Sequence, residues 1–292
     1  MHILLHYIQS VDLSIYDFFN GLAGNYFLDR MAGVMETHNL LKGGLFLALY
    51  WYFWFRSGPD REKRREAIVV ILIGVILALV VARTIAFAAP FRIRPVYDPA
   101  FQHHPYSWLA HMDLENWSAF PSDTATYFFA LACGIAYLAR RLAIPIMLHT
   151  VVWICLPRLY YGIHYASDMV AGAAIGITVV WLALRSGWLR SRLAQQALAA
   201  ADAIPSVFYA AAFLVSYEMT SMFGGIRWLG RELIHAARVG AHHEIVGFAL
   251  IALAILGLAA SGVWIACREC KWRNPALFGP LTGAGDPRTL PE

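Results

Sequence analysis

The sequence predicts an all-α integral membrane protein with a core of five spans, two extra C-terminal transmembrane helices and an N-terminal interfacial helix. Of its 292 residues, 59% are apolar and only 14% are charged, which is more apolar sequence than a soluble domain needs. Several uncharged runs approach or exceed the ~20 residues that a helix needs to cross ~30 Å of hydrocarbon. The basic residues cluster at the ends of these runs, so the net charge of +4 does not indicate a nucleic-acid partner.

Residues 1–38 are predicted to form an amphipathic segment that lies in the membrane interface. Apolar side chains alternate there with Asp12, Asp17 and Asp29. Carboxylates are costly in hydrocarbon, so we do not expect this segment to cross the membrane.

Residues 39–184 are predicted to form the membrane core. Its five spans are expected at about 40–55, 67–89, 122–139, 142–156 and 168–184. Within the fifth span, Gly172 and Gly176 form a Gly-x-x-x-Gly pattern, which allows a neighbouring helix to approach closely.

The chain continues with a basic, alanine-rich cytoplasmic linker at 185–204 and a two-span extension at 205–266. The two spans are expected at 205–223 and 245–266, with a polar stretch between them that suits an interfacial helix. The tail, 267–292, contains an isolated Cys-x-x-Cys and becomes rich in Pro and Gly, so we expect disorder and no zinc site.

Lys and Arg concentrate in loops that this topology places on one side of the membrane. By the positive-inside rule, that side is the cytoplasm. The polar loop 90–118 and the stretch 158–168 are then both expected on the outer face, as a single composite site requires.

The stretch 156–168 carries the chemistry that organises these expectations. Arg158 is followed by His164 and Asp168, all beside the hydrocarbon, where charged groups usually mark a site. A carboxylate four residues after an imidazole shares its helix face and can accept one ring proton, leaving the other nitrogen free to attack. Alternatively, the three side chains merely satisfy one another in an interface loop.

Two further stretches carry polar groups that suit an anion. Arg83, Arg92 and Arg94 lie near the outer end of the second span, where they either bind an anionic substrate or snorkel to the interface. Ser122 and Asp123 follow a proline at a helix start, where free amides attract phosphate, although Ser122 equally suits an ordinary N-cap.

Together, and in this order, the three stretches resemble the type 2 phosphatidate phosphatase superfamily, and most closely its bacterial polyprenyl-diphosphatase-like subgroup. The resemblance covers about residues 40–184. Its motifs appear here as Arg94-Pro95, as Pro121-Ser122, and as Arg158-x5-His164-x3-Asp168. It implies that His164 is the nucleophile that forms a phosphohistidine, with Asp168 and Arg158 as its catalytic partners. The implied phosphate-binding residues are Arg83, Arg92, Arg94, Ser122, Asp123 and Thr124.

The resemblance implies a metal-independent hydrolase, without a cofactor, that acts on a phosphorylated lipid. The expected substrate is a polyprenyl diphosphate such as undecaprenyl diphosphate, in cell-envelope metabolism. The expected location is the bacterial inner membrane, with the site facing the periplasm.

The sequence departs from the family pattern at two positions. The family's first-motif Lys would fall at Phe87, and Arg83 lies one helical turn further back on the same face. The family's general-acid His is replaced by Thr124, which cannot titrate near neutral pH. This leaves open a diphosphatase, a lipid-to-lipid phosphotransferase, or a protein that has lost hydrolysis and binds or transports a phosphorylated lipid.

Overall fold

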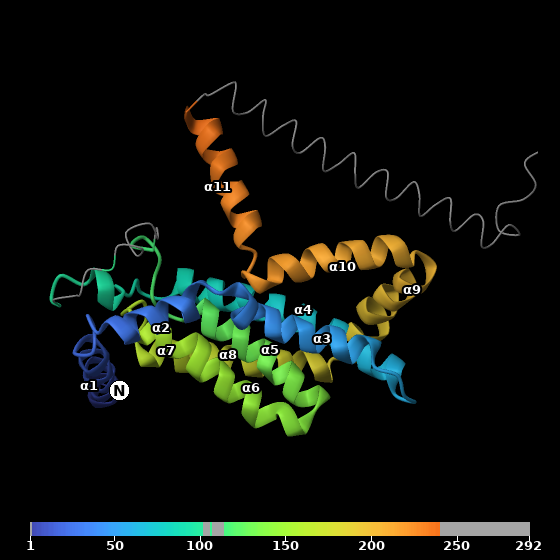
Figure 1. The fold of residues 1–292 in the computed structure, drawn as a ribbon, viewed down its shortest axis with the longest axis horizontal. Coiled ribbons are helices and arrows are strands. Elements are labelled where there is room, and N and C mark those ends of the chain that lie inside the picture. The colour runs from blue at the N-terminus through green and yellow to red at the C-terminus, as the bar shows by residue number, and fades with distance from the viewer. Residues whose placement is uncertain (1, 102–105, 107–113, 240–292) are drawn as a thin grey trace, which may run out of the picture. The chain divides into compact units, whose positions relative to one another are not determined.

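The computed structural model describes residues 2–101, 106 and 114–239, which form helices and connecting loops (Figure 1). Contacts divide the chain into two units, one made of residues 1–198 with 216–225 and the other of residues 199–215 with 226–292. The candidate site lies wholly in the first unit.

Helices α4 (Arg61–Ala88), α5 (Asp123–Leu138) and α8 (Ala166–Arg185) pack against one another and form the centre of this unit (Figure 1). A Cβ atom at Gly172 would lie 2.4 Å from the carbonyl oxygen of Ser122 on the α5 side. At Gly176 it would lie 2.2 Å from the carbonyl oxygen of Thr126. Both distances are shorter than real Cβ contacts, so the predicted close approach at this Gly-x-x-x-Gly pattern is confirmed.

Three helical segments in the described part of the chain are long and apolar enough to cross a membrane: Arg61–Ala88, Arg140–Tyr160 and Ala166–Arg185. They correspond to the second, fourth and fifth expected spans. The first and third expected spans correspond to the shorter apolar helices Leu40–Phe55 and Asp123–Leu138.

The fourth span extends further than its hydropathy indicated. Its expected end at Leu156 is wrong, because helix α7 (Leu156–Tyr160) continues directly from the π-helical turn Thr150–Cys155. Pro157 is tolerated there because it lies in the first turn of α7. Arg158 therefore belongs to the last turn of the span rather than to the loop after it.

The N-terminal segment forms helices α1 (His2–Asn20) and α2 (Tyr26–Thr37), with Asn25 as the N-cap of α2. The segment is helical as expected, but it also packs on the core through α7 and α8. Asp12 and Glu36, on α1 and α2, are buried. Buried carboxylates need cationic partners, and the core supplies them, as described below.

The expected linker at 185–204 is largely helical. A π-helical turn, Leu189–Ala194, leads into α9 (Gln195–Ala203). The physical reason is the run of alanines, since alanine has the highest helix propensity.

The sixth expected span corresponds to α10 (Pro205–Thr220), whose 16 residues fall short of the ~20 that a full crossing needs. The polar stretch after it forms α11 (Gly224–Val239), an amphipathic helix as expected. The seventh expected span, the Cys-x-x-Cys and the tail lie outside the described residues.

Candidate active site

Backbone hydrogen bonds join the three stretches that the sequence singled out. The amide of Ala119 donates to the carbonyl of Arg92 at 2.8 Å, which ties the second stretch to the first. The amide of Ser122 donates to the carbonyl of Asp168 at 3.1 Å, which ties it to the third. Segments far apart in the sequence therefore meet at one place.

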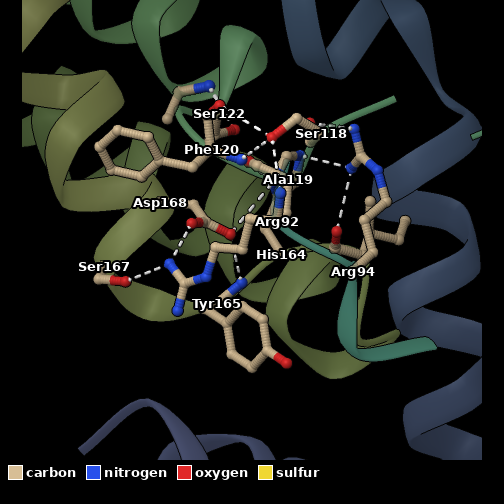
Figure 2. A network of polar contacts seen from close by, with 12 residues as sticks. Arg92, Arg94, Ser118, Ala119, Phe120, Ser122, His164, Tyr165, Ser167 and Asp168 are labelled. Atoms are coloured by element: carbon tan, nitrogen blue, oxygen red, sulfur yellow. Dashed lines mark hydrogen bonds and ion pairs between the residues drawn. The ribbon is translucent and has the colours of Figure 1, made fainter. Parts of the chain in front are cut away.

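His164 lies at the centre of this meeting point and is 2% exposed. Its Nε2 is 3.0 Å from Nη1 of Arg94, and its Nδ1 is 2.9 Å from the carbonyl oxygen of Ala119 (Figure 2). A guanidinium can only donate and a carbonyl can only accept. The proton is therefore on Nδ1, and the lone pair of Nε2 faces Arg94.

The relation between His164 and Asp168 differs from the expected helical one. Helix α8 begins at Ala166, so His164 precedes it, and the prediction that both residues share a helix face is wrong. Asp168 occupies the third helical position, where Oδ2 accepts from the N-cap amide of Tyr165 at 2.9 Å. This oxygen is 3.6 Å from Nδ1 of His164. Asp168 therefore acts on the imidazole through its charge, while the carbonyl of Ala119 accepts the hydrogen bond from Nδ1.

The surroundings of His164 favour its neutral form. Burial is the largest effect and lowers the pKa of His164, and the positive charges of Arg94 and Arg158 lower it further. The Asp168 carboxylate opposes them and raises this pKa. The net direction is downward, so the imidazole is neutral, and able to act as a nucleophile, at neutral pH.

Arg94 is held in place by the backbone. Its guanidinium donates to the carbonyl oxygens of Trp117, Ser118 and Ile163 at 3.1, 3.3 and 3.0 Å. Burial lowers the pKa of Arg94 to about 10, so the side chain remains charged at neutral pH. The result is a fixed cation beside the nitrogen that carries the lone pair.

Arg92 has a different role from the one expected of a phosphate-binding residue. Its Nη2 donates to Oδ2 of Asp12 at 2.7 Å. Its Nη1 donates to Oδ1 of Asp168 at 2.5 Å (Figure 2). Nη1 also donates to Ser167 at 2.8 Å, and the guanidinium lies 4.2 Å from the ring centre of Tyr165. Its donors therefore serve carboxylates and a hydroxyl of the protein itself.

Arg83 reaches the site from α4. Its guanidinium forms an ion pair with Asp123, the first residue of α5, and lies 4.6 Å from the ring centre of Trp117. The first amides of α5 have acceptors within the protein, because Thr124 N–H donates to Asp123 at 2.9 Å and Ala125 N–H donates to Ser122 at 3.3 Å. Ser122 therefore acts as an N-cap.

Arg158 connects the site to the N-terminal segment. Its Nη2 donates to Oε1 of Glu36 at 2.8 Å, and Nζ of Lys42 lies 3.4 Å from the same oxygen. The other carboxylate oxygen, Oε2, and Nε of Arg158 are buried, and neither has a hydrogen-bond partner among the residues that the structure describes. One carboxylate therefore faces two cations, and hydrogen-bonding capacity remains unused within this cluster.

Sequence reasoning missed three contributors to the site. Asp12 was used only as an argument against membrane insertion and Glu36 was not singled out, although an acidic residue on a helix that must be buried calls for a cationic partner. That requirement was a usable signal. Ala119 contributes only its backbone carbonyl, which no side-chain pattern can reveal.

Residues 67–192 match the family model described as the PAP2 superfamily. This region of the chain is similar to that superfamily, whose phosphatases act without a metal ion. The resemblance inferred from the three motifs is confirmed over this region, and the described part of the chain contains three helical segments long and apolar enough to cross a membrane.

Among individual relatives, the Lipid A 4'-phosphatase of Bacteroides thetaiotaomicron is 25% identical over 194 residues, which cover 61% of this chain and 78% of the relative. Among solved structures, the PAP2-type phosphatidylglycerolphosphate phosphatase of Bacillus subtilis is 16% identical. That match has a TM-score of 0.38 and covers 61% of this chain and 84% of the solved chain.

Proposed function

We propose that this protein removes the terminal phosphate of a lipid diphosphate through a phosphohistidine on His164. The observation that carries the proposal is the double contact of the imidazole, with Nδ1–H on the carbonyl of Ala119 at 2.9 Å and Nε2 on Arg94 at 3.0 Å. A lone pair aimed at a fixed guanidinium is suited to attack a phosphorus atom whose oxygens that guanidinium binds.

In the first step, Nε2 attacks the terminal phosphorus and the bond to the bridging oxygen breaks. In this proposal Arg94, Arg158 and Arg83 stabilise the negative charge that grows on the phosphate oxygens. The Asp168 carboxylate balances the positive charge that the phosphorylated imidazole acquires. No metal ion is required in this scheme.

The preference for a diphosphate follows from Thr124. This residue is buried in the first turn of α5, where the family has a titrating His. A phosphate monoester has a second pKa of about 6 and leaves without being protonated. A lipid alkoxide needs a general acid, which threonine cannot supply.

In the second step, water attacks the phosphohistidine and a base accepts its proton. Asp123 is our candidate for this base, because it borders Thr124 and is held by Arg83. A lipid phosphate in place of water would make the protein a phosphotransferase.

We propose that the site faces the periplasm, on the basis of the Lys and Arg distribution.

A second candidate substrate is a lipid A-type glycolipid phosphate, suggested by the relative named Lipid A 4'-phosphatase. Such a phosphate is a monoester on a sugar, so its removal expels an alkoxide and tests the role of Thr124 directly.

The deciding experiment measures phosphate release by the purified protein from a panel of lipids. The panel contains undecaprenyl diphosphate, undecaprenyl monophosphate and lipid A, each assayed with the parent and with Thr124→His. We expect the parent to cleave only the diphosphate, and the variant to gain activity on the monophosphates. If the parent released no phosphate from the diphosphate while Thr124→His did, the proposal would be wrong.

Protein incubated with ³²P-labelled diphosphate and quenched in SDS at alkaline pH should carry a label that survives alkali and is lost in acid, as a phosphohistidine is. The label should be absent in His164→Ala. Undiminished lipid binding by His164→Ala, with no label in the parent, would instead identify a protein that binds or transports the lipid.

A further inference from the structure

The N-terminal helix contributes a buried carboxylate to the polar network around Asp168. Asp12 on α1 is 2% exposed. Its Oδ1 accepts from the amide of Ser167 at 2.8 Å, and its Oδ2 accepts from the hydroxyl of Ser167 at 2.5 Å. Arg92 donates to the same Oδ2 at 2.7 Å. Every one of these donors lies beside Asp168 or contacts it.

Arg92 lies between two carboxylates. It joins Asp12 to Oδ1 of Asp168, whose side chain has no exposed surface. The other oxygen of Asp168 accepts from the amide of Tyr165. Both oxygens of Asp168 are therefore occupied, and Oδ2 lies 3.6 Å from Nδ1 of His164.

The backbone of Arg92 also acts on His164. Its carbonyl accepts from the amide of Ala119, and the carbonyl of Ala119 accepts the Nδ1 proton of His164. Arg92 therefore binds the Asp168 carboxylate through its side chain. Through its backbone it holds Ala119, whose carbonyl accepts the hydrogen bond from His164 (Figure 2).

We propose that Arg92, bracketed by Asp12, is a positioning residue that partly neutralises Asp168 and holds the Ala119 carbonyl in place, so that Nδ1 of His164 donates its hydrogen bond to a neutral carbonyl. This proposal rests on the proposed function only in assigning the nucleophile role to His164. A neutral acceptor leaves Nε2 available without stabilising the protonated ring. A carboxylate acceptor would favour the imidazolium, whose Nε2 cannot attack.

Each segment that surrounds His164 contributes one charged group that acts on the imidazole. Arg94 precedes the short helix Pro95–Tyr97, Arg158 lies on α7, Asp123 on α5 and Asp168 on α8. Arg92 and Asp12 act on the ring through Asp168. Removing either side chain changes how strongly the Asp168 carboxylate stabilises the protonated imidazole. The two substitutions are expected to shift the titration midpoint of His164 in opposite directions.

Titration of His164 tests this directly. The full-length protein, labelled in its histidine rings and purified in detergent, is followed by NMR as the pH is varied, and the His164 signal is assigned by its absence in His164→Gln. We expect Arg92→Gln to move the midpoint upward by about one pH unit, because the freed carboxylate lies within the distance at which an opposite charge shifts a pKa by 1–3 units. Asp12→Asn should move it downward, because Arg92 then loses one of its two counter-charges.

The conservative variant Arg92→Lys keeps the charge and should leave the midpoint close to that of the parent. Equal midpoints in parent and Arg92→Gln, or shifts of the same sign in Arg92→Gln and Asp12→Asn, would overturn the proposal. If Arg92→Gln does not fold, the downward shift in Asp12→Asn decides alone, and an unmoved midpoint there overturns it.

Kinetics add a second readout once a substrate is in hand. A positioning role predicts that Arg92→Gln shifts the acid limb of the pH profile of kcat/KM to higher pH without raising KM. A raised KM with an unmoved limb would identify Arg92 as a phosphate ligand instead. Because the titration needs no turnover, an inactive protein with the expected shifts would refute the proposed function and leave this inference intact.

Discussion

The guanidinium of Arg94 donates to Nε2 of His164 at 3.0 Å, on the side of the ring opposite the carbonyl that accepts the Nδ1 proton. This contact fixes the tautomer of the imidazole and places a cation where the phosphate oxygens would lie. Arg94 is thus both an anion-binding group and an orienting group for the nucleophile.

Substitution of Arg94 by Gln should therefore reduce kcat/KM for diphosphate cleavage by about 10²–10³, the usual loss for one preorganised donor. Arg94→Lys should recover part of the activity, because a lysine keeps the charge but lacks the planar fork. Phosphate release measured across a substrate series gives both values. Activity within twofold of the parent in Arg94→Gln would contradict this assignment.

The depressed pKa of His164 predicts how stability changes with pH. In the unfolded chain the imidazole takes up a proton near pH 6.5, whereas burial keeps it neutral in the folded protein to a lower pH. As the pH falls below 6.5, the unfolded state binds the extra proton and the folded state loses stability, until the pH reaches the folded pKa. Above pH 6.5 His164 makes no pH-dependent contribution.

Apparent Tm values from pH 8 to pH 5 should show this difference between the parent and His164→Gln. The Tm of the parent should fall more steeply below pH 6.5, and the two curves should run parallel above it. Parallel curves throughout the range would mean that His164 titrates normally in the folded protein.

The contact between α5 and α8 predicts a strong effect of a single methyl group. Gly176→Ala places a Cβ 2.2 Å from the Thr126 carbonyl, so the helices must separate. We expect a loss of about 1–3 kcal/mol, the usual range for overpacking. Gly187→Ala is the matched control, since its Cβ would meet nothing within 4 Å. Chemical unfolding in detergent measures both variants, and equal stabilities would contradict the close helix contact.

The ion pair between Glu36 and Arg158 predicts that losing the carboxylate is costly. Glu36→Gln leaves Arg158 and Lys42 buried beside each other without a counter-charge, and breaking such a pair costs about 3–5 kcal/mol. Asp60→Asn is the control, because Asp60 pairs with Lys63 while 71% and 87% of the two side chains are exposed, and exposed pairs contribute about 0–1 kcal/mol. Chemical unfolding of both variants measures the difference, and a Glu36→Gln protein as stable as the control would refute it.

The sequence was informative where a signal depends on composition or on local spacing. The apolar runs predicted the spans at Arg61–Ala88 and Ala166–Arg185, and the glycine pair predicted the contact between α5 and α8. The order of the motifs predicted the family. In each case the signal lies within one continuous stretch.

The remaining features depend on contacts between distant parts of the chain. Helical periodicity placed His164 on α8, but the capping of that helix by Tyr165 starts it two residues later and separates the imidazole from Asp168. The charge of Arg92 suggested a phosphate ligand, because its partner Asp12 lies 80 positions away. Spacing alone could not show that this cation was already neutralised.

The involvement of α1 and α2 has a practical consequence for anyone who wishes to build a minimal version of this protein. The region that matches the family begins at residue 67, whereas Asp12 and Glu36 precede it. A fragment trimmed to the family boundaries would retain the imidazole and its arginines but would lose both acidic anchors. Chimeras and truncations should therefore keep the first helices, and affinity tags belong at the opposite terminus.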